Sequence, residues 1–106
     1  MDVERVPGPK RAEDATRVLH ASELRDLARL SVEARPGGFA RCWTRKEAYR
    51  KATGEGLSCE APRDRYLGAG PPPARLPGRR IIDVDVPDGW AAACVVRTAG
   101  DGSVRR

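Results

Sequence analysis

One stretch of the sequence, residues 43–57 (WTRKEAYRKATGEGL), restricts the fold most. Residues 46–52 are good helix formers, and the two glycines that follow favour the end of a helix. Trp43, Glu47 and Lys51 are four residues apart, so on a helix they share one face. Two interpretations remain open. Either an exposed Glu–Lys pair lies beside a core tryptophan, which is common, or a carboxylate and an ammonium face one ligand.

The start of this helix is ambiguous in the sequence. The segment 34–38 (ARPGG) predicts a break in the chain, after which the helix could begin near Gly38 or only at Thr44. The spacing from Thr44 to Glu47 matches a capping box, which would leave Glu47 less free to hold a ligand. In the longer version, Phe39 and Trp43 line the buried side of the helix.

The first six residues, MDVERV, alternate in the way typical of a strand. Asp2 and Glu4 are expected on one face of this strand, and Val3 on the other. Together with Glu47, the two carboxylates would form an all-oxygen cluster suited to a hard cation, most simply Mg²⁺. For the strand alone, a polar end exposed to water is the simpler interpretation.

Two further helices are expected between these motifs. The first spans residues 11–20, with Ala12, Ala15 and Leu19 on one face, and the second follows Ser22, which would cap it. Glu23 then lies in the first turn of the second helix, where the helix dipole favours a carboxylate.

The C-terminal half predicts a loop followed by a hairpin. Residues 58–78 are rich in proline and lack periodicity, with at most a short strand around residues 65–67. Residues 79–86 and 90–97 read as two strands joined by Pro87, Asp88 and Gly89, with Asp83 and Asp85 on the solvated face. The order of elements is strand, three helices, then antiparallel strands, an α+β fold. We expect one domain over residues 1–99 and a flexible tail over residues 100–106.

Composition adds coarse limits. With 106 residues and a net charge of +5, the chain suits a single small domain with anionic partners. Only five aromatic residues are present, which makes a stacking surface for nucleic acid a minor alternative. No apolar run predicts a membrane span and no signal-peptide pattern is present, so a cytoplasmic location is expected. Three widely spaced cysteines indicate reduced thiols.

The sequence of residues 43–57 resembles the W-S/T-x-K-E-A/S-x-x-K-x-x-G-x-G-L signature of 4'-phosphopantetheinyl transferases, and every fixed position of the signature is matched. Residues 1–6 are similar to the family's G-I/V-D-I/V/L-E strand from its aspartate onward. Residues 18–24 look similar to its F-S/T-x-x-E segment, and residues 89–96 to its closing strand. The resemblance implies the fold of one lobe of this family. That lobe is the C-terminal half of the surfactin-synthetase-activating type or a short domain like holo-(acyl-carrier-protein) synthase.

This resemblance also implies an activity and a site. The expected reaction is the Mg²⁺-dependent transfer of the 4'-phosphopantetheine arm of coenzyme A to a serine of an apo acyl or peptidyl carrier protein, as in fatty acid, polyketide or nonribosomal peptide biosynthesis. Asp2, Glu4 and Glu47 would hold the metal. Glu47 and Lys51 would be catalytic, and Lys46 and Lys51 would bind the phosphates of coenzyme A.

Other parts of the expected function rest on the same resemblance. Glu23 could approach the metal, although its place at a helix start explains it without such a role. Arg45 and Arg50 could meet the acidic surface of a carrier protein. The coenzyme A cleft would need a homo-oligomer or a missing N-terminal lobe. The alternatives are an inactive, truncated lobe that only binds a carrier protein or a partner lobe, and a small basic nucleic-acid-binding protein.

Overall fold

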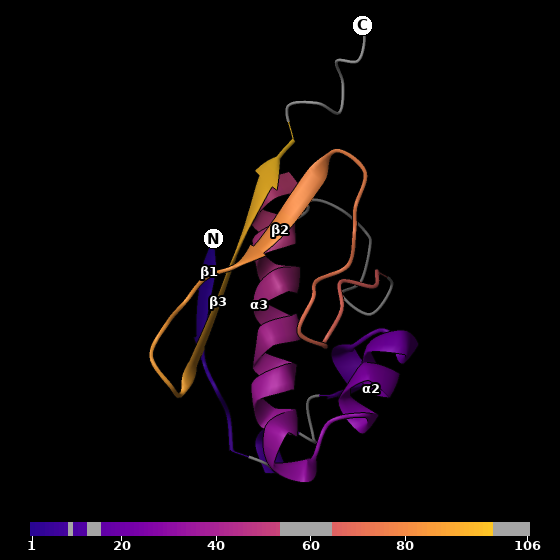
Figure 1. Ribbon diagram of the computed structural model, residues 1–106, viewed down its shortest axis with the longest axis vertical. Helices are drawn as coiled ribbons and strands as arrows, with labels where there is room; N and C mark the ends of the chain where they lie inside the picture. The colour runs from indigo at the N-terminus through magenta and orange to yellow at the C-terminus, as the bar shows by residue number, and fades with distance from the viewer. Residues whose placement is uncertain (9, 13–15, 54–64, 99–106) are drawn as a thin grey trace, which may run out of the picture.

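The computed structural model describes residues 1–8, 10–12, 16–53 and 65–98. A three-stranded antiparallel sheet has the long helix α3 (Arg35–Thr53) packed along one face, in contact with all three strands (Figure 1). The strands are β1 (Asp2–Arg5), β2 (Arg79–Asp83) and β3 (Trp90–Arg97), and their order in the sheet is β1-β3-β2. The α+β class predicted from the sequence is confirmed.

Strand β1 has the alternation that the sequence predicts. Asp2 pairs with Ala93 and Glu4 with Ala91, so both acidic side chains belong to the sheet face that carries the buried Ala93. Asp2 is only 7% exposed, whereas Val3, on the other face, is 46% exposed. The two carboxylates therefore face α3, and the strand is not simply a solvated end.

The predicted hairpin is present, with a longer connection than expected. β3 has the predicted bounds, but β2 ends at Asp83, so residues 84–89 join the strands. Val84 N donates to Ala92 O at 2.9 Å and Trp90 N to Pro87 O at 3.2 Å. Gly89 turns the chain with a φ of +91°, which residues with side chains rarely adopt.

Helix α3 begins at Arg35, so the break predicted over residues 34–38 is wrong. Pro36 is compatible with this start, because the N–H groups of the first helical turn have no partner within the helix. The guanidinium of Arg35 donates from Nε to Leu27 O at 3.2 Å and to Leu30 O at 3.3 Å, which fixes the start of α3 against the preceding segment. The longer helix implied by the family resemblance is therefore the correct one.

Helix α2 (Ala21–Ala28) is capped by His20, not by Ser22 as predicted. His20 Nδ1 accepts a hydrogen bond from Ser22 N at 3.0 Å, and Glu23 Oε1 accepts one from His20 N at 2.8 Å. These reciprocal bonds form a capping box in which an imidazole nitrogen replaces the usual hydroxyl. Ser22 lies inside the helix.

The helix predicted over residues 11–20 is wrong as a continuous element. Residues 10–12 are helical, η1 (Thr16–Val18) is a 3-10 turn, and residues 19–20 are not helical. A second 3-10 turn, η2 (Val32–Ala34), leads into α3. None of the helices in the described ranges is long and apolar enough to cross a bilayer.

Two apolar clusters form the core, and α3 contributes to both. The first contains Phe39 and Cys42 of α3 with Leu19, Leu27 and two alanines, and the second joins Tyr49 of α3 to Leu67 and Ile81. The Phe39 and Trp43 rings stack at 6.5 Å between centroids, on the side of α3 where burial was predicted.

Residues 65–67 are not a strand, so that prediction is wrong; the segment that contains them is held by side chains instead. The predicted helix end at Gly54 and Gly56, and the predicted tail over residues 100–106, lie outside the described residues.

The two adjacent glycines of α3 give a matched test of how closely the helices pack. A Cβ at Gly38 would lie 2.6 Å from Leu30 Cδ1 and 2.8 Å from Leu27 Cδ2, whereas a Cβ at Gly37 meets nothing within 4 Å. We expect Gly37→Ala to raise the free energy of unfolding by up to about 1 kcal/mol, because alanine favours the helix. Gly38→Ala should lower it, because overpacking costs about 1–3 kcal/mol. Urea denaturation of both variants measures the difference, and equal gains would show that α2 does not pack this closely on α3.

Candidate functional site

Four charged side chains lie close together where β1 packs on the C-terminal half of α3: Asp2, Glu4, Glu47 and Lys51. Lys51 Nζ lies 2.9 Å from Asp2 Oδ1 and donates more weakly to Met1 O at 3.4 Å. Glu47 lies one turn before Lys51, and its Oε2 accepts a hydrogen bond from Arg50 Nη1 at 3.2 Å. The structure thus brings Asp2, 49 positions away in the sequence, onto the helix face that Glu47 and Lys51 share.

The pKa directions show that these groups act on one another. Burial raises the pKa of Glu4, a hydrogen bond with Asp2 and the charges of Asp2 and Glu47 raise it further, while Lys51 opposes them. The hydrogen bond and charge of Asp2 raise the pKa of Lys51, with Glu47 and Glu4 adding to the effect. Asp2, Glu4, Glu47 and Lys51 therefore form one electrostatic cluster, in which the carboxylates outnumber the ammonium.

Asp2 carries an oxygen that its surroundings leave unsatisfied. Its Oδ2 is buried and has no hydrogen-bond partner in the described ranges, although Oδ1 is bound by Lys51. A buried carboxylate oxygen without a partner is unfavourable unless a cation or a donor satisfies it.

The cluster fits Mg²⁺ by its chemistry, since all its potential ligands are carboxylate oxygens. No three Asp, Glu, His or Cys side chains of the described chain are already arranged to hold a metal, so binding would require these side chains to move.

Lys46 and Glu23 do not join this cluster. Lys46 is 2% exposed and Glu23 is fully buried, and the Lys46 Nζ lies 2.7 Å from Glu23 Oε1. Lys46 also donates to Arg65 O at 2.8 Å, and Glu23 Oε2 accepts from the backbone N–H groups of Leu67 and Gly68. The two residues predicted to approach phosphate or metal instead join α2, α3 and the segment that begins at Arg65.

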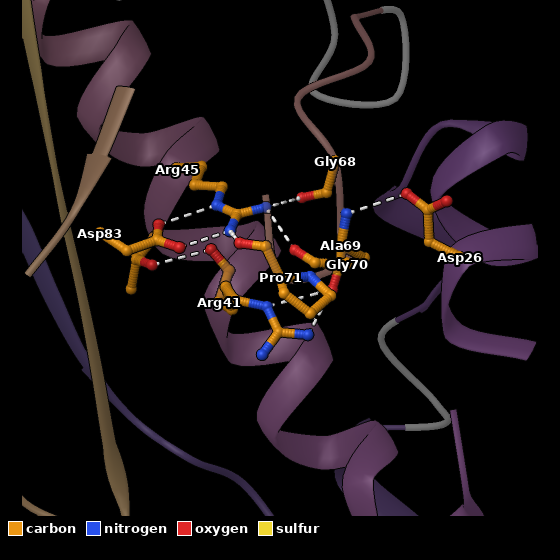
Figure 2. Close-up of polar contacts among 9 residues, drawn as sticks. Asp26, Arg41, Arg45, Gly68, Ala69, Gly70, Pro71 and Asp83 are labelled. Carbon is orange, nitrogen blue, oxygen red and sulfur yellow. Dashed lines mark hydrogen bonds and ion pairs between the residues drawn. The ribbon is translucent and has the colours of Figure 1, made fainter. Parts of the chain in front are cut away.

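Arg45 is buried, in contrast to its predicted place on a carrier-protein surface. Its guanidinium donates to Gly68 O at 2.7 Å, Pro71 O at 2.9 Å and Gly70 O at 3.0 Å (Figure 2). Nε donates to Asp83 Oδ1 at 2.8 Å and Nη2 to Asp83 Oδ2, so all five N–H donors are satisfied. Asp83 therefore lies on the sheet face toward α3 and offsets the charge of the buried guanidinium, while its side chain stays 33% exposed to solvent.

The segment 66–71 is held from both sides by charged side chains. Arg41 Nη2 donates to Ala69 O at 2.7 Å, while Asp26 Oδ2 accepts from Ala69 N at 3.1 Å (Figure 2). Asp26 also accepts from the Tyr66 hydroxyl at 2.6 Å, which raises the pKa of Tyr66 to about 12. Acids of α2 bind the N–H groups of this segment and arginines of α3 bind its carbonyls. The segment is thus fixed without secondary structure of its own.

An α+β lobe with a carboxylate cluster and a lysine between an edge strand and a long helix suits an enzyme that handles phosphates with a divalent cation. A sequence model of the 4'-phosphopantetheinyl transferase superfamily matches residues 1–68, which include β1, α2 and α3. The chain belongs to this superfamily. No curated protein and no solved structure matches it.

The raised pKa of Glu4 predicts how stability depends on pH. Because its pKa is higher in the folded protein, the contribution of Glu4 is fully present at acid pH and is lost as the pH rises through its folded pKa, above 4.5. At pH 7 without divalent cations, Glu4→Gln should therefore be more stable than the unmodified protein, and the difference should shrink toward pH 4. Denaturation midpoints across this range measure the effect, with Glu33→Gln as an exposed control; a difference independent of pH would contradict it.

Arg45 gives a second prediction on stability. Arg45→Lys should lower the free energy of unfolding by about 3 kcal/mol or more, because one ammonium cannot satisfy the acceptors of a buried guanidinium. Arg29, whose side chain is 79% exposed, provides the control, and Arg29→Lys should change stability by less than about 0.5 kcal/mol. If chemical denaturation gave similar values for the two variants, Arg45 would not organise this part of the fold.

Proposed function

We propose that this protein transfers the 4'-phosphopantetheine arm of coenzyme A to a serine of an apo acyl or peptidyl carrier protein, with Mg²⁺. The observation that carries the proposal is the superfamily match over residues 1–68, since that range contains the whole carboxylate and lysine cluster. The unsatisfied, buried Oδ2 of Asp2 supports it further, because it marks the cluster as a place for a cation.

In this proposal, Asp2, Glu4 and Glu47 hold the metal. A bound Mg²⁺ would offset the charge of the pyrophosphate and of the departing group. The same cation would also offset the charges of Asp2 and Glu47, which add to the effect of burial on the pKa of Glu4. Lys51 pairs with Asp2, but its side chain is 57% exposed, so it can turn toward a phosphate oxygen that enters from solvent.

The reaction is a phosphoryl transfer in which Glu47 accepts a proton. The serine hydroxyl of the carrier protein forms a bond to the phosphorus next to pantetheine, and the bond from that phosphorus to the bridging pyrophosphate oxygen breaks. Adenosine 3',5'-bisphosphate leaves, and the serine proton passes to Glu47 or to a water that it orients. Lys51 stabilises the negative charge of the departing phosphate. Lys46 supports this chemistry only by fixing α3 through Glu23.

The alternative of an incomplete lobe that binds a partner has its own observation. The sheet face turned away from α3 exposes apolar side chains, with Val3, Trp90, Ile82 and Val96 each between 38% and 46% exposed. Apolar exposure of this kind favours contact with another protein surface. A chain that associates but transfers nothing would be this second candidate.

The first test is the intact mass of an apo carrier protein after incubation with the protein, coenzyme A and Mg²⁺. We expect a phosphopantetheine adduct, and Glu47→Gln should slow its formation by about 10²-fold or more, the range of a lost general base. Glu33→Gln, on the exposed 3-10 turn η2, should react at the unmodified rate. An adduct formed equally fast by Glu47→Gln would exclude the assigned role, and a folded protein that gives no adduct would favour the incomplete lobe.

A further inference from the structure

The lysine of the candidate site already has a partner. Lys51 Nζ and Asp2 Oδ1 are 2.9 Å apart, and this contact is the first cause of the raised pKa of Lys51. In the same cluster Arg50 pairs with Glu47 at 3.2 Å. Cations of α3 therefore already occupy two of the carboxylates to which the proposed function assigns the metal.

The two partners of the Lys51–Asp2 pair differ in their freedom to move. The Asp2 side chain is 8% exposed and held in the sheet by β1, whereas the Lys51 side chain is 57% exposed on a flexible stem. A divalent cation on the unpaired Oδ2 of Asp2 would lie close to the ammonium on Oδ1 and weaken that ion pair, because two cations on one carboxylate repel each other. Lys51 is the more mobile partner, so exchange at Asp2 moves Lys51 outward into solvent.

The charge balance of the cluster changes sign with this exchange. Asp2, Glu4 and Glu47 supply three negative charges, and Lys51 and Arg50 supply two positive ones, so the cluster repels an anion. A divalent cation reverses the balance to a net positive charge. Only in that state is the ammonium of Lys51 both free and surrounded by a potential that attracts phosphate.

We propose that Lys51 is an internal cation that occupies Asp2 until a divalent metal replaces it, so that metal binding is the event that releases Lys51 for phosphate. The phosphate ligand rests on the proposed function, but the exchange between lysine and metal does not. Because coupling between two ligands is reciprocal, phosphate that binds Lys51 must also tighten metal binding. Lys51 is then a residue that sets the order of binding as well as one that contacts the substrate.

The decisive measurement is the affinity for Mg²⁺ alone, by isothermal titration calorimetry, without coenzyme A or carrier protein. Removal of a competing cation should tighten binding, so we expect Lys51→Met to bind Mg²⁺ about twofold to fivefold more tightly, the range of a single exposed ion pair. Arg29→Met removes the same charge from an exposed side chain of the fold and should leave the affinity unchanged. Weaker or equal binding by Lys51→Met overturns the proposal.

A second variant tests the release of Lys51 by changing its partner, Asp2. In EDTA, Asp2→Asn should bind coenzyme A more tightly than the unmodified protein, because its lysine is no longer paired. If both proteins bound coenzyme A measurably and equally, the release of Lys51 would be wrong, whatever the effect of Glu47→Gln on transfer. If the unmodified protein bound no Mg²⁺, the metal site and the exchange would both be wrong. If it bound Mg²⁺ but modified no carrier protein, the exchange would stand without the proposed transfer.

Discussion

The buried guanidinium of Arg45 is the interaction on which the arrangement of this lobe depends. It joins three parts of the chain that are distant in sequence: helix α3, the end of β2 through Asp83, and the carbonyls of Gly68, Gly70 and Pro71. A guanidinium without solvent is tolerated only when all its donors are used, so the position of each partner is restricted by the others. The neighbouring Lys46–Glu23 pair extends the same restriction to α2.

Adjacent residues of one motif thus serve opposite sides of α3. Arg45 and Lys46 are withdrawn from water and fix the helix against the segment 65–71, while Glu47 and Lys51 face β1. A helix turns about 100° per residue, so this division is possible within a few consecutive positions. The rotation of α3, and with it the direction of Glu47, is therefore set by ion pairs on its far side.

The sequence predicted the elements with local patterns and missed those fixed by distant partners. Alternation predicted the two faces of β1, a run of β-forming residues predicted the bounds of β3, and the helix formers over residues 46–52 predicted the C-terminal part of α3. A proline and two glycines suggested a break, but Pro36 fits a first helical turn and Gly38 is where Leu27 and Leu30 pack. The burial of Arg45 could not be predicted, because most of its acceptors are backbone carbonyls, which no residue type marks. The family resemblance assigned Asp2, Glu47 and Lys51 to one site, which spacing alone could not do. It did not predict that Lys51 would pair directly with Asp2.

Among the described strands, β1 lies at an edge of the sheet and is bonded only to β3. Half of the candidate site is therefore carried by a strand with hydrogen bonds on one side only, which is the part of a sheet that opens most readily. A ligand that bridges Asp2 and Glu4 to Glu47 would stabilise the contact between this strand and α3. Ligand binding and the local opening of β1 would then be coupled. The coupling would slow the exchange of the β1 backbone amides with solvent.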